Sequence, residues 1–266
     1  MVKNLEPQEL KVQQIRVSIL RLASEKFEVG AHLGSALSLA EIFSVLPDYF
    51  DFSEEDNLVL SKGHASLVLY TLLNGTQNPE TIAKFKGKLL GHPVKCPELG
   101  IKFSTGSLGI GFASAVGLAL YKKLNNESGT VVVILGDGET DEGIVYESAR
   151  IASKYKLSNL LAILDVNGFQ QTGSRVVISG DHSLRGLWES LRWRTKNING
   201  HLLSDINESL ADFAREIGGA DYPTIIFAST IKGKGLSPFE NTNDSHHITL
   251  TPQRYEELIS AITEVK

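Results

Sequence analysis

Apolar runs and amphipathic stretches alternate along the second half of the chain. The segments 131–135 and 160–165, which are apolar throughout except for the final Asp165, are typical of strands buried on both faces, and the stretch 143–155 between them has helical spacing. The alternation continues as a strand-like segment, a helical pattern and another strand, at 193–198, 202–217 and 223–230. This pattern predicts an α/β fold with a parallel sheet covered by helices on both faces.

The first half of the chain predicts helices joined by glycine-containing loops. Helical spacing covers 7–26 and, after a loop, 38–49. "DNLVLSKGHAS" predicts a short strand entering a polar turn before a helix over "LVLYTLL", and "STGSLGIGFASAVGLALYKKL" predicts a glycine turn followed by a small-residue helix. A closing helix is expected over 251–265. No linker rich in Pro, Gly or Ser divides the chain, so we expect one domain over 1–266.

Composition and charge narrow the classes of protein. Of the 266 residues 42% are hydrophobic, enough to fill a substantial core. The net charge is -5 and the basic residues are scattered, so we expect neither a nucleic acid nor a membrane as partner. The single cysteine, Cys96, excludes an internal disulfide, and neither a signal peptide nor an apolar run of roughly 20 residues is present. We therefore expect a cytoplasmic globular protein.

Two short polar clusters follow directly on apolar runs. They are "GDG" at 136–138 and "DVN" at 165–167, and they place Asp137 and Asn167 about one strand-helix-strand unit apart. In a parallel sheet such a crossover brings the carboxyl ends of both strands to the same edge, where open α/β sheets bind ligands. We therefore expect these two side chains to lie side by side.

The chemistry of these clusters suits a hard cation and a phosphate group. A carboxylate, an amide carbonyl and nearby backbone carbonyls are ligands for Mg²⁺ or Ca²⁺, which usually also keep phosphate oxygens and water. Gly136 and Gly138 allow the backbone to approach a bulky anion. The alternative is ordinary turn chemistry, in which Asp137 caps the next helix. The two clusters together favour a metal-bridged diphosphate site.

Four of the seven histidines lie in polar, glycine-flanked loops: His32, His64, His92 and His246. Imidazole is suited to binding and deprotonating sugar hydroxyls near neutral pH. No histidine pair has the i, i+4 spacing of a zinc motif, which argues against a zinc site. The remaining histidines have no comparable motif and are expected to be surface residues: His182, His201 and His247.

These motifs together resemble a known family. "GDG" followed about 30 residues later by Asn is similar to the thiamine diphosphate motif. Four further stretches resemble transketolase: "AHLGSALS", "LSKGHAS", "GHPV" with "TGSLGIG", and "IKGKG" with "SHH". The resemblance covers about residues 10–250 in the family's order, and it implies the thiamine diphosphate-binding fold of the PP-type (diphosphate-binding) domain.

The resemblance implies a set of cofactor contacts. Mg²⁺, with Ca²⁺ or Mn²⁺ as substitutes, would be held by Asp137, Asn167 and the backbone carbonyl of Phe169. Thiamine diphosphate would be contacted by residues from several loops, namely His64, Gly106, Ser107, Leu108, Asp137, Gly138, Glu142, Asn167, Lys232 and His246. Glu142 would also lie near the interface between subunits, Glu147 would be a nearby buried carboxylate, and the alternative for Lys232 is a solvated loop charge.

The resemblance also implies the roles of the four loop histidines. His32 and His246 would contact the ketose hydroxyls and assist proton transfer. His64 would lie near both cofactor and substrate, and His92 would bind the terminal hydroxymethyl group of the donor. The implied reaction is transfer of a two-carbon ketol unit from a ketose or ketose phosphate to an aldose.

In this family the activating glutamate beside the aminopyrimidine ring lies in a following pyrimidine domain, which the sequence does not contain. The resemblance therefore implies the N-terminal subunit of a split transketolase, inactive alone. It would form an α₂β₂ heterotetramer with a C-terminal pyrimidine-domain subunit.

Several positions depart from the commoner transketolase pattern. They are Ala31, Ile110, Val166 and the "SHH" around His246. None of these departures removes a proposed ligand. They indicate a reshaped pocket rim, which suits a ketose other than the ordinary pentose phosphates.

Other functions stay open. A 1-deoxyxylulose-5-phosphate synthase or an E1-type decarboxylase subunit would use the same cofactor, and a non-catalytic paralogue would bind it without turnover. A nicotinamide dehydrogenase would rest on "GIGFAS" at 109–114, which lacks a preceding strand and the acidic residue that normally follows.

Overall fold

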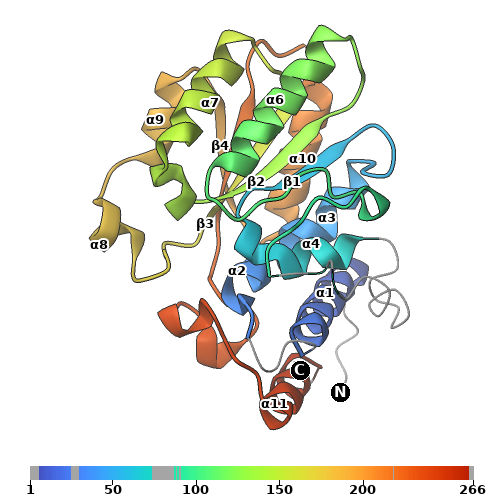
Figure 1. Ribbon diagram of the computed structural model, residues 1–266, viewed down its shortest axis with the longest axis vertical. Coiled ribbons are helices and arrows are strands. Elements are labelled where there is room, and N and C mark those ends of the chain that lie inside the picture. The colour runs from blue at the N-terminus through green and yellow to red at the C-terminus, as the bar shows by residue number, and fades with distance from the viewer. Residues whose placement is uncertain are drawn as a thin grey trace.

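One sheet of five parallel strands, in the order β1-β2-β3-β5-β4, organises the chain (Figure 1). This computed structural model describes residues 6–24, 30–73, 87, 89, 91–217 and 219–263. The strands are β1 Asn57–Leu60, β2 Val131–Gly136, β3 Leu160–Val166, β4 Arg194–Asn199 and β5 Thr224–Ser229. β2 and β3 are neighbours and are joined by one helix, as the sequence predicts.

The helices fall into two groups that cover opposite faces of the sheet. Along β2, Val132 and Ile134 belong to one hydrophobic core, and Val131, Val133 and Leu135 belong to the other. The first core takes side chains from α1 Pro7–Ser24, α2 Leu33–Leu37, α3 Ala40–Val45, α4 Ser66–Leu72, α10 Leu203–Glu216 and α11 Pro252–Thr263. The second takes them from α6 Ile110–Leu124, α7 Gly143–Lys154 and α9 Leu184–Ser190. Burial on both faces explains why the central strands β2 and β3 are continuous apolar runs.

Most predicted elements agree with the structure. The four strands β2 to β5 and the two helices α7 and α10 match the predicted ranges within one residue at each end. α1 is helical to Ser24 and α11 to Thr263. The predicted helices extend to 26 and 265, and these last two positions of each lie outside the described residues. α1 and α11 pack together, so the two terminal helices lie side by side (Figure 1). Among the described helices, none combines the length and apolarity needed to cross a bilayer.

The helix predicted over 38–49 is wrong at its start. Helical structure begins at Leu33, five residues earlier, and is interrupted at Ser38 before α3 and a 3₁₀ turn at Leu46–Asp48. The buried Ser38 hydroxyl bonds the Ser35 carbonyl at 3.0 Å and an Asp165 carboxylate oxygen at 2.7 Å. This tertiary contact holds the interruption in place.

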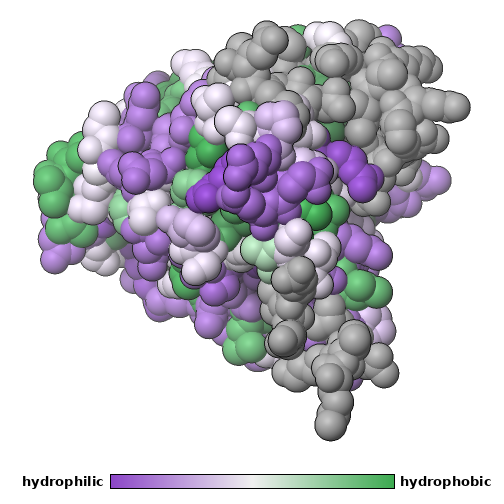
Figure 2. Space-filling model, turned by 90° about the horizontal axis from the view of Figure 1, so that it is seen from below, coloured by the Kyte–Doolittle hydropathy of each residue, from purple (hydrophilic) through white to green (hydrophobic). Residues whose placement is uncertain are grey.

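Two short helices occupy the segment between β3 and β4. They are α8 Arg175–Ser179 and α9, each with a serine N-cap whose hydroxyl accepts a backbone N–H. α9 buries Trp188, whose ring lies 4.8 Å from that of Trp193. α8 instead exposes Val176, Val177 and Ile178, and hydrophobic residues protrude in Figure 2 at the side where Figure 1 places α8.

Candidate active site

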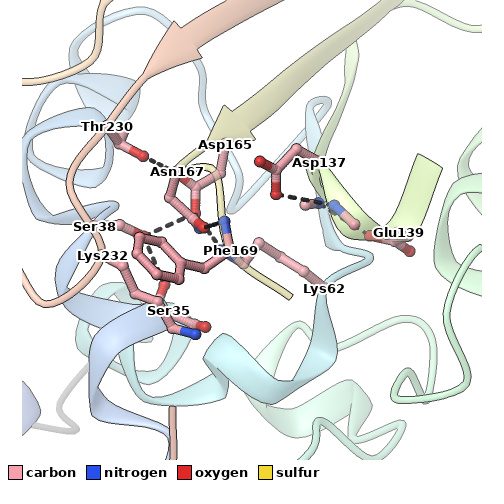
Figure 3. A network of polar contacts seen from close by, with 12 residues as sticks. Ser35, Ser38, Lys62, Asp137, Glu139, Asp165, Asn167, Phe169, Thr230 and Lys232 are labelled. Carbon is pink, nitrogen blue, oxygen red and sulfur yellow. Dashed lines mark hydrogen bonds and ion pairs between the residues drawn. The ribbon is translucent and has the colours of Figure 1, made fainter. Parts of the chain in front are cut away.

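The carboxyl ends of β2 and β3 meet in register, with Gly136 opposite Asp165. Directly beyond them, the Asp137 amide donates to the Asp165 carbonyl at 3.2 Å, and Asp137 Oδ2 accepts the Gly168 N–H at 2.8 Å. Figure 3 shows Asp137 and Asn167 on these neighbouring strand ends. The prediction that one crossover brings them side by side is confirmed.

Asp137 is a buried carboxylate that receives hydrogen bonds from backbone amides. Its second oxygen accepts the Gly138 N–H at 2.9 Å, so it also caps the 3₁₀ turn Gly138–Asp141, as the turn alternative predicts. Burial, and then the negative charge of Asp165, raise the pKa of Asp137 to about 6. A bound cation would favour its ionised form, so this position fits a metal ligand.

Asn167 has its side-chain amide fixed in one orientation. Its Nδ2 donates to Asp165 Oδ2 at 3.0 Å, and its Oδ1 accepts the Phe169 N–H at 3.0 Å. Within the described ranges no three His, Cys, Asp or Glu side chains group as metal ligands. A cation at this edge would therefore depend on the mixed set of carboxylate, amide and backbone oxygens that the sequence predicts.

Asp165 forms an ion pair that the sequence prediction missed. It is fully buried, pairs with the Lys62 ammonium and accepts hydrogen bonds from the Ser38 and Thr230 hydroxyls (Figure 3). Burial alone would raise the pKa of Asp165, but Lys62 and these hydrogen bonds hold it below its usual value. Asp165 therefore stays charged, and this charge fixes the Asn167 amide and affects the titration of Asp137.

Glu139 is a second buried carboxylate that the sequence prediction missed. It accepts the Ser61 hydroxyl, the Gly109 N–H at 2.8 Å and the Gly136 N–H at 3.2 Å, and burial raises its pKa. It therefore ties the turn after β2 to the turn that precedes α6. A Glu directly after "GDG" was the available signal.

The turn Gly106-Ser107-Leu108 lies against the histidine loops. Gly106 has a φ of +141°, and a Cβ on it would come within 2.9 Å of His92 Cδ2. The backbone thus requires glycine here to approach the histidine. The predicted contacts of this turn with the cofactor stay predictions.

Five imidazole rings gather beside this edge, and we refer to them as the histidine cluster. The ring centroid of His32 lies 5.7 Å from that of His64, 5.8 Å from His92, 5.1 Å from His246 and 5.0 Å from His247. The structure therefore brings together all four predicted histidines and adds His247. That residue is exposed, as expected, but it lines a cavity of about 200 Å³ together with His32 and His64.

Three rings of the histidine cluster, those of His32, His64 and His246, are uncharged at neutral pH. Burial, followed by the neighbouring histidine and lysine side chains, lowers the pKa of His32 and that of His246 to about 4. Burial and the Lys62 ammonium hold the pKa of His64 well below its usual value. Neutral imidazoles can accept protons from sugar hydroxyls, which agrees with the chemistry expected of them.

Lys232 joins the two halves of the site. Its side chain is buried, which contradicts the alternative of a solvated loop charge. Its Nζ lies 3.5 Å from the Gln170 carbonyl, 3.3 Å from His246 Nδ1 and 5.5 Å from the centre of the Phe169 ring. Burial and the positive charge of Lys62 lower the pKa of Lys232 to about 8.

Two other expectations are wrong. His201 is not a surface residue, because its side chain is 11% exposed and Nδ1 lies 3.1 Å from Glu41 Oε2. Glu147, expected to be buried, is exposed on this chain because it lies on the solvent side of α7. His182 is partly buried beside Arg175, and Glu142 is exposed at the start of α7.

Comparisons with known proteins match nearly the whole chain. Residues 8–261 match the family model described as transketolase, thiamine diphosphate binding domain. The chain is 31% identical to one of the subunits of the apulose-4-phosphate transketolase of Phocaeicola vulgatus, and the alignment covers 99% of this chain and 95% of that protein. It is 32% identical to the SqwG subunit of the 6-deoxy-6-sulfo-D-fructose transketolase of a Clostridium species, with 97% and 98% covered.

Solved structures agree with this assignment. The crystal structure of transketolase from Campylobacter jejuni is similar with a TM-score of 0.83 and 29% identity, covering 96% of this chain and 43% of that one. The chain thus spans less than half of the solved transketolase and nearly all of the relatives named as subunits. The α/β fold predicted from the sequence is confirmed.

Proposed function

Because this chain belongs to the family of transketolase thiamine diphosphate-binding domains, we propose that it is the diphosphate-binding subunit of a two-subunit transketolase. The proposed reaction transfers a two-carbon ketol unit from a ketose to an aldose. Relatives of the same length that are named as transketolase subunits support this division of the enzyme.

The observation that carries the proposal is the continuity between the strand-end site and the histidine cluster. Lys232 Nζ lies within 3.5 Å of the Gln170 carbonyl, on the loop after β3, and 3.3 Å from His246. An anion at the strand ends would therefore share one cationic side chain with a substrate held by the histidines. Anchoring of a diphosphate beside a sugar-binding pocket is what a transketolase requires.

We propose that Mg²⁺ is held by Asp137, Asn167 and the Phe169 carbonyl. The burial and raised pKa of Asp137 support this. Each of its two oxygens accepts one backbone N–H, and the nearby Asp165 charge is already paired with Lys62. Asp165 then serves to orient the Asn167 amide through its 3.0 Å hydrogen bond. Such outer contacts commonly orient metal ligands.

Thiamine diphosphate, when bound, supplies a carbon nucleophile and an electron sink for cleavage of a C–C bond. The residues of this chain bind the sugar and move its protons. His32 and His246, neutral at working pH, accept protons from the ketose hydroxyls, and His92 binds the terminal hydroxymethyl group. His64 would lie near both cofactor and substrate, and its ring centroid is 5.7 Å from those of His32 and His246.

A second subunit completes the proposed enzyme. It would supply the pyrimidine-binding domain with the activating glutamate, in an α₂β₂ assembly. The exposed apolar residues of α8 support coverage by a partner, because α8 is tied to the site through Ser179, which Gln170 Nε2 contacts at 2.8 Å.

The donor is proposed to be a ketose other than the ordinary pentose phosphates. Two relatives of about the same length are named for apulose-4-phosphate and for 6-deoxy-6-sulfo-D-fructose. His247 at the pocket rim supports a modified substrate, since it adds a hydrogen-bonding ring beside His32. Both named sugars and the pentose phosphates belong in a donor screen.

The test combines the purified chain with a pyrimidine-domain subunit, thiamine diphosphate and Mg²⁺, and measures ketol transfer. We expect turnover from the pair and none from either chain alone. Full activity of the isolated chain would contradict the two-subunit proposal. Cofactor binding by the pair without turnover of any ketose would contradict transketolase activity and favour a non-catalytic paralogue.

A further inference from the structure

We infer that three buried side chains, Arg16, Glu41 and His201, form a brace that positions Lys232 from behind the site. The inference rests on the proposed function, because it gives Lys232 the task of contacting the cofactor. The brace residues come from α1, from α3 and from the turn after β4, and Lys232 lies in the loop after β5. They act as positioning residues and reach Lys232 only through its backbone.

The brace holds the loop on both sides of Lys232. The Ile231 N–H donates to His201 Nε2 at 2.7 Å. Arg16 Nε donates to the Lys234 carbonyl at 3.2 Å. The backbone is therefore fixed at the residue before Lys232 and at the second residue after it.

Glu41 connects the two contacts into one unit. Arg16 Nη2 lies 2.5 Å from Glu41 Oε1, and His201 Nδ1 lies 3.1 Å from Glu41 Oε2. Since His201 Nε2 accepts a backbone N–H, the ring proton is on Nδ1, which makes a close electrostatic contact with the carboxylate outside hydrogen-bond geometry. The side chains of all three residues are at most 14% exposed, so removal of Arg16 leaves the Glu41 charge, and removal of His201 leaves the Ile231 N–H, without its partner.

The loop needs such support because its own sequence is permissive. Gly233 and Gly235 both have positive φ, +78° and +90°. A Cβ on Gly235 would come within 2.7 Å of Arg16 Nε, so glycine allows the arginine to approach the backbone closely. Glycine-rich backbone has many accessible conformations, and the brace selects the one that directs Lys232 Nζ toward His246 and the Gln170 carbonyl.

The experiment measures the affinity of the assembled two-subunit enzyme for thiamine diphosphate with Mg²⁺, by isothermal titration. We expect His201→Phe, which keeps the ring shape and removes both nitrogens, to weaken binding about tenfold. His201→Gln, which can still accept the Ile231 N–H, should stay within about threefold of wild type. Hydrogen exchange of the segment 230–235 should be faster in the Phe variant before any cofactor is added.

A double-variant cycle separates positioning from general damage. In a Lys232→Ala background, His201→Phe should cause no further loss of affinity, because it acts through Lys232. Leu210→Ala, which truncates a buried core residue of α10, is the control: it should lower stability without changing affinity or exchange at 230–235. If His201→Phe does not fold, Arg16→Lys replaces it, since lysine can pair with Glu41 but lacks the second donor for the Lys234 carbonyl.

The outcomes are distinguishable. Wild-type affinity in folded His201→Phe, or in Arg16→Lys if the Phe variant does not fold, would overturn the inference. The inference would also be overturned if His201→Phe weakened the affinity for thiamine diphosphate as much in the Lys232→Ala background as in the wild type. If the wild-type pair binds no thiamine diphosphate, the proposed function fails instead.

Discussion

Replacement of Asp137 by Asn tests the proposed metal site most directly. In the folded chain the pKa of Asp137 is about 6, against an ordinary 3.8, a difference that corresponds to about 3 kcal/mol. Because the folded pKa is raised, this carboxyl favours folding at low pH and opposes it as the pH rises through 6. The Asn variant removes that cost but leaves one backbone N–H facing an amide NH₂, so the stability without ligands should change by less than about 2 kcal/mol.

Ligand binding should respond far more strongly than stability. Loss of one charged ligand of a cation is expected to cost about 3 kcal/mol, which corresponds to roughly a 100-fold weaker Kd for thiamine diphosphate with Mg²⁺. In the wild type, a proton on Asp137 competes with the metal, so the apparent Kd should rise about tenfold per pH unit below 6. The Asn variant should lack this dependence between pH 5 and 6, and it controls for protons taken up by the cofactor.

Isothermal titration of the assembled pair, with and without Mg²⁺, measures both effects. Asp205→Asn is the matched control, because Asp205 also accepts a backbone N–H but lies at the start of α10. It should leave affinity unchanged. An Asp137→Asn variant that binds within threefold of wild type, or a wild-type Kd with the same pH profile as the variant, would refute the metal assignment.

Three further predictions concern the glycine turn, the histidine cluster and the pocket rim. Gly109→Ala should lower the free energy of unfolding by about 2–4 kcal/mol in urea titrations, because Gly109 has φ +82° and a Cβ would lie 2.4 Å from Ile144 Cγ2. The control is Gly117→Ala, at a helical position of α6 with open space around it, which should raise the free energy of unfolding by about 0.5–1 kcal/mol. In the histidine cluster, His32 and His246 bind fewer protons in the folded than in the unfolded chain between pH 6.5 and 4. Acidification from pH 7 to 4.5 should therefore lower the free energy of unfolding by on the order of 3 kcal/mol, after the opposite contribution of Asp137 is subtracted; an unchanged or rising value would contradict neutral His32 and His246. His247→Ala should raise the KM for the ketose about threefold to tenfold without altering cofactor affinity, and an unchanged KM would remove His247 from the substrate pocket.

The sequence allowed the site to be located but did not reveal how it is supported. Asp137 and Asn167 could be placed together because both follow buried strands and one crossover joins those strands. Lys62 and Asp165 could not be paired, since they are 103 residues apart and neither has a local signal of its partner. His201 was expected at the surface for the same reason: its burial depends on α3, which lies far away in sequence.

The sequence by itself determined the order and type of the main elements and the positions of the strand-end and histidine motifs. These are local properties, since hydrophobic periodicity and residue type act over a few neighbouring positions. Only the tertiary structure decided which charges are paired, which buried carboxyl groups have a raised pKa and which ring joins the histidine cluster. Those properties depend on burial and on contacts between distant segments, because desolvation and hydrogen bonding act in space and not along the chain.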